Sequence, residues 1–260
     1  MSTDFLWDRP ATAAGWPVGY DRILLDETDS TMAEARRRAP ELAGPTWIFA
    51  KRQTQPHGRR GRAWAHPDGN FAATLFLRPG GTAEQAALRS FTAAVALFYT
   101  LGMTTGQKGL TLKWPNDVLL NGGKVAGILL ESSARAGGVD WLAIGIGINL
   151  VEAPPTDAVE PGAVPPVSVK GVVGKVETAE DTLFWLASHY ADHERIFTEF
   201  GFDPIRRLWL RHAARLGEVI TARTARDSLS GTFETVDEVG QLVLRTAKGQ
   251  VAIPAADVFF

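Results

Sequence analysis

The sequence predicts an α+β protein in which a larger domain of strands and helices precedes a small β-rich domain. Apolar runs such as 46–50 and 140–150 have the length and composition of buried strands. The stretches 82–102 and 178–202 instead place apolar residues at helical spacing. From Gly217 onward the chain consists of short β-like segments broken by glycine and aspartate, which is typical of a compact barrel.

Composition limits the class of protein. With 260 residues, 45% of them hydrophobic and 22% charged, the chain can form one large globular domain and a smaller one. The net charge of −2 gives no overall attraction to nucleic acid or to an anionic membrane. The absence of cysteine excludes disulfides, thiolate metal sites and cysteine nucleophiles. We see neither a secretory leader nor an apolar run of about 20 residues, and we therefore expect a soluble, cytoplasmic protein.

The N-terminal part predicts an irregular segment over 1–20, a short strand over 22–25 and then a helix. Thr31, with Glu34 three residues later, has the form of a capping box, and Pro40 ends the helix. The hydroxyl groups at the start of this helix have two interpretations. They cap the helix, or together with its free amide groups they bind a polar ligand.

A basic loop comes after the strand at 46–50. Residues 51–64, KRQTQPHGRRGRAW, contain five arginine and lysine residues and no acidic residue. Gly58 and Gly61 let the backbone turn tightly and approach a ligand closely. Because a second buried strand, 70–77, comes next, the loop is held by a rigid scaffold, as binding loops commonly are. It is either a solvated surface loop or a loop that wraps an anion.

Three further helices are predicted. The alanine-rich stretch 82–102 is expected to end at Gly102. The helix at 178–202 begins with a threonine and an aspartate in capping positions, and another helix covers 204–217. Three histidines in these helices lack the spacing of metal ligands, and we expect them to be surface or packing residues: His189, His193 and His212.

A hairpin over 110–132 gathers polar residues. Asn121-Gly122 is the strongest short-range hairpin signal, and Pro115 interrupts the first strand. Lys124 is either a hairpin lysine in water or, because a buried lysine without a partner is costly, a residue that faces a polar pocket or pairs with a carboxylate. Four polar side chains near the strand ends favour a binding site: Lys113, Asn116, Asp117 and Lys124.

A glycine-containing strand and a proline-rich loop come after the hairpin. In the strand at 140–150, Gly145 and Gly147 leave room for a neighbouring group to pack closely. This strand lacks the third glycine and the subsequent helix of a dinucleotide-binding fingerprint. Asn149 at its end either lines a site or terminates the strand. Five prolines within 151–170 predict a long loop without structure of its own.

Four motifs occur in order along the chain: DST at 29–31, GRRGRAW at 58–64, KWPNDVLLNGGKVAGIL at 113–129 and GIGIN at 145–149. In this order and spacing they resemble the biotin–protein ligases, from about residue 24 to the C-terminus. The resemblance implies a mixed-sheet catalytic domain at 21–213 with helices on one face, and a small SH3-like barrel at 214–260, after an irregular segment at 1–20. It implies the monofunctional type, because residues 1–20 are too few for the three-helix DNA-binding module of bifunctional members.

The resemblance also implies a reaction. An ATP- and Mg²⁺-dependent ligase would convert biotin and ATP into biotinyl-5′-AMP and pyrophosphate, and would then pass the acyl group to one lysine of a biotin carboxyl carrier domain of a biotin-dependent carboxylase. Biotin and ATP are substrates here, and no tightly bound prosthetic group is expected. The resemblance allows a homodimer, while neither DNA nor a membrane is an expected partner.

Site residues are implied by the resemblance position by position. The residues implied for biotin are Ser30, Thr31, Gln53, His57, Gly58, Arg59 and Lys124. Those implied for ATP and the adenylate are Arg59, Arg60, Arg62, Trp64, Asn116 and Asn149, in which the arginine forks match phosphate oxygens. The implied catalytic residues are Lys124, which stabilises charge in both half-reactions, Arg59, and Asp117, which holds Mg²⁺ and helps to deprotonate the incoming lysine.

Two positions depart from the family pattern. His57 stands where an arginine is usual, so if that arginine binds phosphate in the family, its place is taken here by a side chain whose charge depends on pH. Met32 stands where an asparagine is common, so a polar contact with the substrate is missing there.

Three other functions compete with this interpretation. A lipoate or octanoate ligase or transferase shares the fold and the lysine chemistry but lacks GRRGR and KWPND in this form. A nucleic-acid-binding protein could use the basic loop, yet the net charge and the absence of interleaved aromatic residues oppose it. A non-catalytic biotin-binding protein would bind biotin without forming an AMP adduct.

Overall fold

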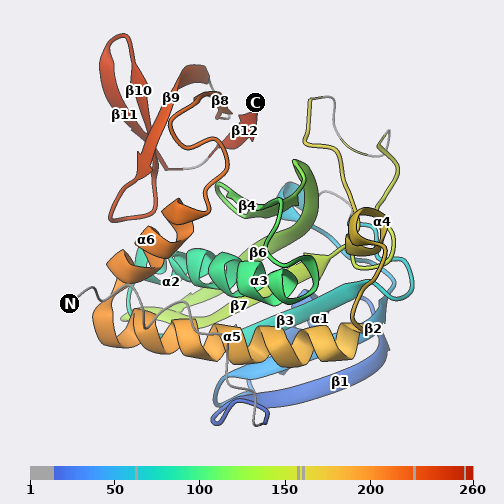
Figure 1. Cartoon of the computed structure of the whole chain (residues 1–260). Coiled ribbons are helices and arrows are strands. Elements are labelled where there is room, and N and C mark those ends of the chain that lie inside the picture. Colours follow the sequence, from blue (N-terminus) through green and yellow to red (C-terminus); the bar gives the residue numbers. More distant parts are fainter. Residues whose placement is uncertain are drawn as a thin grey trace, which may run out of the picture.

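A computed structural model describes residues 15–61, 64–156, 159, 162–224, 227–254 and 256–259, with the side chain of Arg60 excepted. Within these residues the strands form a seven-stranded sheet and a five-stranded sheet (Figure 1). The first sheet has the order β1-β2-β3-β7-β6-β5-β4. In it, β1 and β2 pair in parallel and the other neighbours pair antiparallel, so the sheet is mixed as expected.

The larger part contains strands and helices in a mixed order, with β4 to β7 following one another directly. Its strands are β1 (Asp21–Thr28), β2 (Thr46–Gln53), β3 (Phe71–Leu77), β4 (Leu110–Lys113), β5 (Asp117–Leu120), β6 (Gly123–Arg135) and β7 (Gly138–Ile148). Its helices are α1 (Thr31–Arg38), the 3₁₀ turn η2 (Arg59–Gly61), α2 (Ala83–Ala87), α3 (Arg89–Thr105), α4 (Val169–Val173), α5 (Ala179–Phe200) and α6 (Phe202–Arg211).

Helices cover both faces of the large sheet, which corrects the expectation that they lie on one face. Successive side chains of a strand point to opposite faces. Trp47 and Phe49 on β2 therefore pack into the main core with α3 and α5, while Ile48 between them packs with Met32 and Ala35 of α1. Because the short helix α1 spans only eight residues, it covers only part of its face of the sheet.

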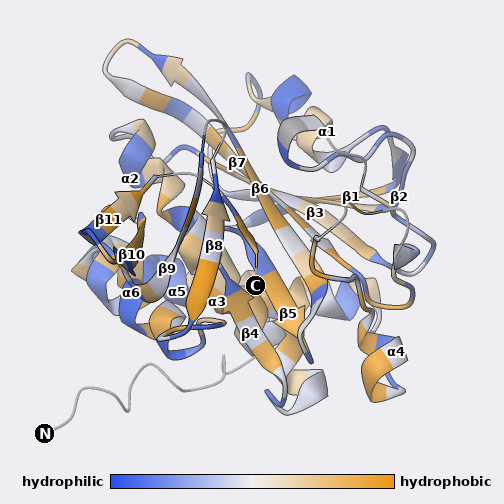
Figure 2. Cartoon of the chain, turned by 90° about the horizontal axis from the view of Figure 1, so that it is seen from above, coloured by the Kyte–Doolittle hydropathy of each residue, from blue (hydrophilic) through white to orange (hydrophobic). Residues whose placement is uncertain are grey.

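The layer of α3 and α5 is the main hydrophobic core. These two helices run side by side across the sheet (Figure 1), and hydrophobic residues are concentrated on the strands beside them (Figure 2). The α2–α3 stretch is long and apolar enough to span a membrane, but most of it is buried inside the protein. The three histidines expected in the helices are packing residues: His189 and His193 of α5 are buried, and His212, directly after α6, stacks on Phe98.

Two predicted helices end at other residues than expected. The helix expected at 82–102 breaks at Leu88, and α3 continues past Gly102 to end at Thr105, capped by Gly106, whose φ of 64° favours glycine. The helix expected at 204–217 ends at Arg211, because the next residues leave it to pair with β4 through Ala213.

The expected capping box of α1 is wrong. Ser30 occupies the capping position, but its side chain makes no capping hydrogen bond. The hydroxyl and amide of Thr31 donate to Gln53 instead, and the carboxylate of Glu34 binds the arginines of the last turn. The predicted cap of α5 is confirmed, since the Thr178 hydroxyl accepts a hydrogen bond from the amide of Asp181.

The C-terminal part is a small antiparallel sheet. It consists of β8 (Val219–Arg223), β9 (Ser228–Val236), β10 (Leu242–Thr246), β11 (Gly249–Ile253) and β12 (Asp257–Phe259), in the order β11-β10-β9-β8-β12. The end strands β11 and β12 do not pair with each other in the described part of the chain, so the sheet is open and not the closed barrel that we expected. A hydrogen bond of 3.0 Å from the indole of Trp114 to the carbonyl of Gly240 joins it to the larger part.

The buried histidines predict how stability depends on pH. Burial, helped by neighbouring His193, lowers the pKa of His189 from 6.5 to about 4. The unfolded chain therefore binds more protons in this window, and stabilisation present above pH 6.5 is lost as the pH falls towards 4. The unfolding free energy of the wild type should fall as the pH is lowered from about 6.5 to about 5. In His189→Gln this fall should be smaller by about 2 kcal/mol, as measured by urea titration at each pH. Identical pH slopes for both proteins would contradict this.

Candidate active site

A cavity of about 530 Å³ opens on the α1 side of the large sheet, a volume typical of small-molecule sites. Strands β2, β6 and β7, the basic loop, the β4–β5 turn, the proline-rich loop and β12 all contribute to its lining. Nine of the predicted site residues line it: Gln53, His57, Gly58, Arg59, Trp64, Asn116, Asp117, Lys124 and Asn149. The structure thus brings together residues that are up to 96 positions apart, from 53 to 149.

Glycines form the floor of the cavity. A Cβ atom on Gly147 would lie 2.6 Å from the indole of Trp64, and one on Gly145 would lie 2.8 Å from the terminal methyl of Met32. Gly127 on the neighbouring strand also faces Trp64. The prediction that the two glycines of β7 admit a closely packed group is therefore confirmed, and that group includes the tryptophan of the basic loop.

Opposite charges alternate in the wall formed by β4, β5 and β6. Pro115 divides the predicted first strand into β4 and β5, which pair with each other so that Lys113 lies opposite Asp117. The Asp117 carboxylate lies 2.7 Å from Nζ of Lys124 and 3.7 Å from Nζ of Lys113. Desolvation lowers the pKa of the Lys113 ammonium, against the opposing attraction of Asp117. One carboxylate thus faces two ammonium groups.

The backbone of Lys124 is held by the proline-rich loop. Its amide donates to the carbonyl of Pro165 at 2.8 Å, and its carbonyl accepts from the amide of Val167 at 2.9 Å. Asn149 reaches the same segment, because its side-chain amide donates to the carbonyl of Val167 at 3.2 Å. This part of the loop is therefore fixed to β6, while the Lys124 ammonium lies over the ring of Trp64 at 5.5 Å.

The basic loop closes one side of the cavity. Arg59 donates a hydrogen bond to the Asn116 side chain at 3.2 Å, and its guanidinium lies 4.0 Å from the Asp257 carboxylate on β12. His57, which departs from the family pattern, lies 3.4 Å from Glu131 on β6. The predicted contributions of the Arg60 side chain and of Arg62 lie outside the described residues.

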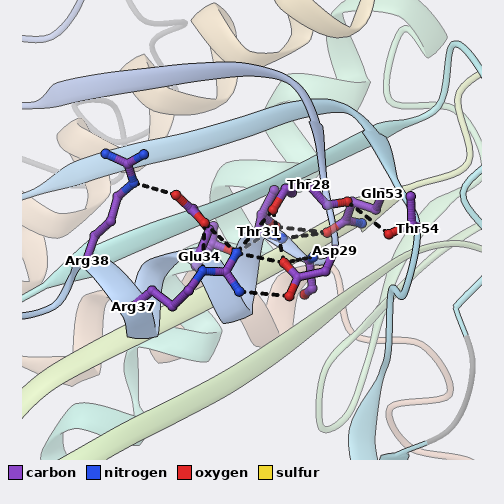
Figure 3. Close-up of polar contacts among 10 residues, drawn as sticks. Thr28, Asp29, Thr31, Glu34, Arg37, Arg38, Gln53 and Thr54 are labelled. Carbon is purple, nitrogen blue, oxygen red and sulfur yellow. Dashed lines mark hydrogen bonds and ion pairs between the residues drawn. The ribbon is translucent and has the colours of Figure 1, made fainter.

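Ser30 and Thr31 are buried beside the cavity and do not line it. The Thr31 amide and hydroxyl both donate to the Gln53 side-chain oxygen, at 2.8 and 3.2 Å (Figure 3). The hydroxyl of Thr74 donates in turn to that of Thr31. Gln53, which does line the cavity, thus links the start of α1 to it.

The sequence does not indicate every residue that lines the cavity. It places Lys113 among the polar hairpin residues without indicating a role for it, and it marks Met32 only as a departure from the family pattern. The strand β12 adds Asp257, Val258 and Phe259 from the far end of the chain, and no local pattern in DVF indicates a site. A separate sheet that folds back over a cavity leaves no periodic signal in the sequence.

The arrangement suits a ligand that joins an anionic part to an apolar part. Arg59, Lys113 and Lys124 supply cations near the β4–β5 turn, whereas the glycine floor and the Met32 side chain are apolar. Because these side chains are positively charged, they favour a ligand that carries carboxylate or phosphoryl groups. In the described part of the chain, no group of three or more histidine, aspartate or glutamate residues could hold a metal ion by itself.

Comparison with known proteins gives a consistent result. Residues 24–149 match the biotin/lipoate A/B protein ligase family, and residues 216–260 match the biotin protein ligase C-terminal domain. The chain is 53% identical over 238 residues to a biotin–[acetyl-CoA-carboxylase] ligase of Paracoccus denitrificans, covering 91% of this chain and 99% of that protein. It is 32% identical to the bifunctional ligase/repressor BirA of Bacillus subtilis, over 90% of this chain and 71% of that protein. A biotin protein ligase from Aquifex aeolicus, solved in complex with biotin and ATP, superposes with a TM-score of 0.77 at 25% identity, covering 92% and 97% of the two chains.

The glycine floor predicts a graded effect of added methyl groups. Gly147→Ala would place a methyl 2.6 Å from the Trp64 indole and displace it, whereas Gly127→Ala, with its nearest contact at 3.2 Å, requires only a small shift. We expect acrylamide quenching of the Trp64 fluorescence, taken as the difference from the Trp64→Phe background, to rise most for Gly147→Ala. Gly44→Ala is the matched control, because no atom lies within 4 Å of that position. Equal quenching in all three variants would show that Trp64 does not rest on this floor.

Proposed function

The chain belongs to the biotin/lipoate A/B protein ligase family, and we propose that it is a biotin protein ligase that forms biotinyl-5′-AMP from biotin and ATP. It then transfers the biotinyl group to a lysine of a biotin carboxyl carrier domain. The relatives reported above are biotin ligases, so lipoate or octanoate is not the favoured acyl substrate.

One observation carries this proposal: three cationic side chains and an apolar floor share a single cavity. Adenylation brings a carboxylate next to a triphosphate, and the two repel each other in water. Lys124 and Lys113 at the β4–β5 turn, with Arg59 on the basic loop, can neutralise both groups and hold them in reacting geometry. The same charges then stabilise the leaving pyrophosphate and, in the second step, the leaving AMP.

The biotin half of the site is proposed to lie between α1 and the glycine floor. Gln53 lines the cavity with its side-chain oxygen bound by Thr31, so a ureido group could exchange hydrogen bonds with this pair. The buried hydroxyl of Ser30 lies beside them. Met32, in place of the usual asparagine, offers an apolar surface to the sulfur-containing ring. The roles of His57 and Gly58 beside biotin stay predictions.

The adenylate half is proposed to lie between Trp64 and Asn149. The side-chain oxygen of Asn149, a lining residue, is buried and accepts no hydrogen bond from the described residues, and we propose it as the acceptor for an amino group of a ligand. Trp64 provides an aromatic wall, and Arg59 with Asn116 lies where phosphates would need neutralisation. Arg60 and Arg62 keep their predicted role in phosphate binding.

Magnesium is proposed to arrive with ATP and not as a resident ion. Mg²⁺ is commonly held by one or two carboxylates together with substrate phosphates, and Asp117 supplies one such carboxylate in the cavity. Its oxygens contact Lys124 and Lys113 without the nucleotide, so they become available when Lys124 turns to the anionic ligand. Bound there, the ion would neutralise charge on the phosphates. Help from Asp117 in deprotonating the acceptor lysine stays a prediction.

The acceptor reaches the activated acyl group only after the adenylate forms. The nitrogen of its neutral amine forms a bond to the acyl carbon of the mixed anhydride, the carbon–oxygen bond to AMP breaks, AMP leaves with the electron pair, and the nitrogen releases one proton to solvent. Closure of the basic loop would protect the anhydride from water in the interval. A cytoplasmic location fits these needs, because ATP is available there and the chain has no cysteine that requires oxidation.

The central test is labelling of a carrier domain. We expect the protein, biotin and Mg-ATP to add one biotin mass increment to a single carrier lysine, and lipoate to replace biotin poorly, as measured by mass spectrometry.

Lys124→Ala should lower biotin-dependent pyrophosphate exchange by about 10²- to 10³-fold, because it removes charge stabilisation at the reacting centre. Lys108→Ala, an exposed lysine in a turn, is the matched control. Wild-type exchange by Lys124→Ala would exclude the role proposed for this lysine.

A further inference from the structure

Arg37 lies on the exposed side of α1, outside the cavity and outside the four sequence motifs. We propose that Arg37 is a positioning residue for biotin binding, because it fixes the corner between β1 and α1 by clamping Asp29. This inference rests on the proposed function and adds to it a residue that touches no substrate.

The clamp is a pair of parallel hydrogen bonds. Nη1 of Arg37 donates to Oδ2 of Asp29 and Nη2 donates to Oδ1, each at 2.7 Å (Figure 3). The guanidinium also binds Glu34 on its own helix, and this second contact restrains the orientation of the arginine side chain. Bidentate pairs of this kind fix orientation as well as distance. The Arg37 guanidinium, with the Ser30 amide and the Thr28 hydroxyl, holds the pKa of Asp29 well below its usual range, so the carboxylate stays ionised.

Asp29 is the point at which three segments meet. Its carboxylate accepts hydrogen bonds from the Ser30 amide at 2.7 Å and from the Thr28 hydroxyl at 3.0 Å. Its backbone carbonyl accepts from the amide of Gln55 at 2.8 Å, just beyond the end of β2. A single clamped residue therefore holds the end of β1, the start of α1 and the base of the basic loop.

The residues next to this corner are those proposed to bind biotin. Ser30 comes directly after Asp29, and Thr31 binds Gln53, which lines the cavity. A small rotation of the corner would move both hydroxyls and the base of the loop together. Directional hydrogen bonds to a ligand weaken steeply with such misalignment.

Because the Arg37–Asp29 pair is exposed, its effect on biotin binding can be measured apart from its effect on folding stability. The Arg37 and Asp29 side chains are 51% and 39% exposed, and exposed ion pairs contribute little to folding. Loss of Arg37 should therefore leave the melting temperature nearly unchanged while the biotin contacts loosen. A residue with a purely structural role would show the opposite pattern.

Arg38 provides a matched control on the same helix. It carries the same charge and binds the same Glu34 carboxylate, but no described contact joins it to Asp29. A comparison of Arg37→Ala with Arg38→Ala thus removes one guanidinium in each case and breaks the corner clamp in only one.

The test is isothermal titration of the full chain with biotin, together with steady-state kinetics. We expect Arg37→Ala to raise the biotin Kd and the KM for biotin about fivefold, and to leave kcat and the KM for ATP within about twofold. Arg38→Ala should bind biotin like the wild type, and Arg37→Lys should recover part of the loss. Asp29→Asn should weaken biotin binding as much as Arg37→Ala, and the double variant should be no worse than either.

The outcomes distinguish failure of the proposed function from failure of the clamp. If the wild type binds no biotin, the proposed function fails and this inference falls with it. If the wild type binds biotin and Arg37→Ala binds it as Arg38→Ala does, only the positioning role of Arg37 is overturned. Should Arg37→Ala not fold, Asp29→Asn decides the matter alone, and a biotin Kd like that of the wild type in this variant overturns the inference.

Discussion

The Asp117 carboxylate lets two lysine ammonium groups share one largely buried wall. Without it, Lys113 and Lys124 would repel each other in a region where water cannot solvate them fully, and a buried unpaired charge costs several kcal/mol. With it, both cations are assembled before an anionic ligand arrives. The rest of the structure around the cavity keeps this group of charges in place: the turn at Pro115 sets Lys113 opposite Asp117, and the proline-rich loop holds the backbone of Lys124.

This preassembly has a chemical consequence. A carboxylate and a triphosphate meet only where positive charge offsets their repulsion, and cations that already lie in the cavity when the ligand binds need little reorganisation during the reaction itself. Arg59 completes the group from a loop that also carries Trp64, the residue that rests on the glycine floor. Charge and apolar surface are therefore supplied by one loop, between β2 and β3, and by the rigid sheet beneath it.

Much of this arrangement could be predicted from short-range signals. Asn121-Gly122 specified the β5–β6 hairpin, Thr178 specified the start of α5, and Gly147 indicated a closely packed neighbour. Where local signals and tertiary contacts compete, the prediction failed. Gly102 did not end its helix, because the left-handed C-cap that ends it is formed by Gly106, and Thr31 did not cap α1, because Gln53 from the next strand binds it.

Contacts that depend on how the chain turns and packs account for the features that were not predicted. The approach of β12 to the cavity, with Asp257 beside Arg59, depends on how a second sheet packs against the first, and no periodicity records that. The clamp between Arg37 and Asp29 likewise joins residues eight positions apart, and it forms only because the chain turns from a strand into a helix between them. Such contacts become visible only in three dimensions.

A crystal structure with biotin and a non-hydrolysable ATP analogue tests the role of Asp117 most directly. We predict that Nζ of Lys124 leaves Asp117 and lies within hydrogen-bonding distance of the biotin carboxylate or the α-phosphate, while Lys113 stays beside Asp117. A complex in which Lys124 remains 2.7 Å from Asp117 and the anionic groups bind elsewhere would contradict this role.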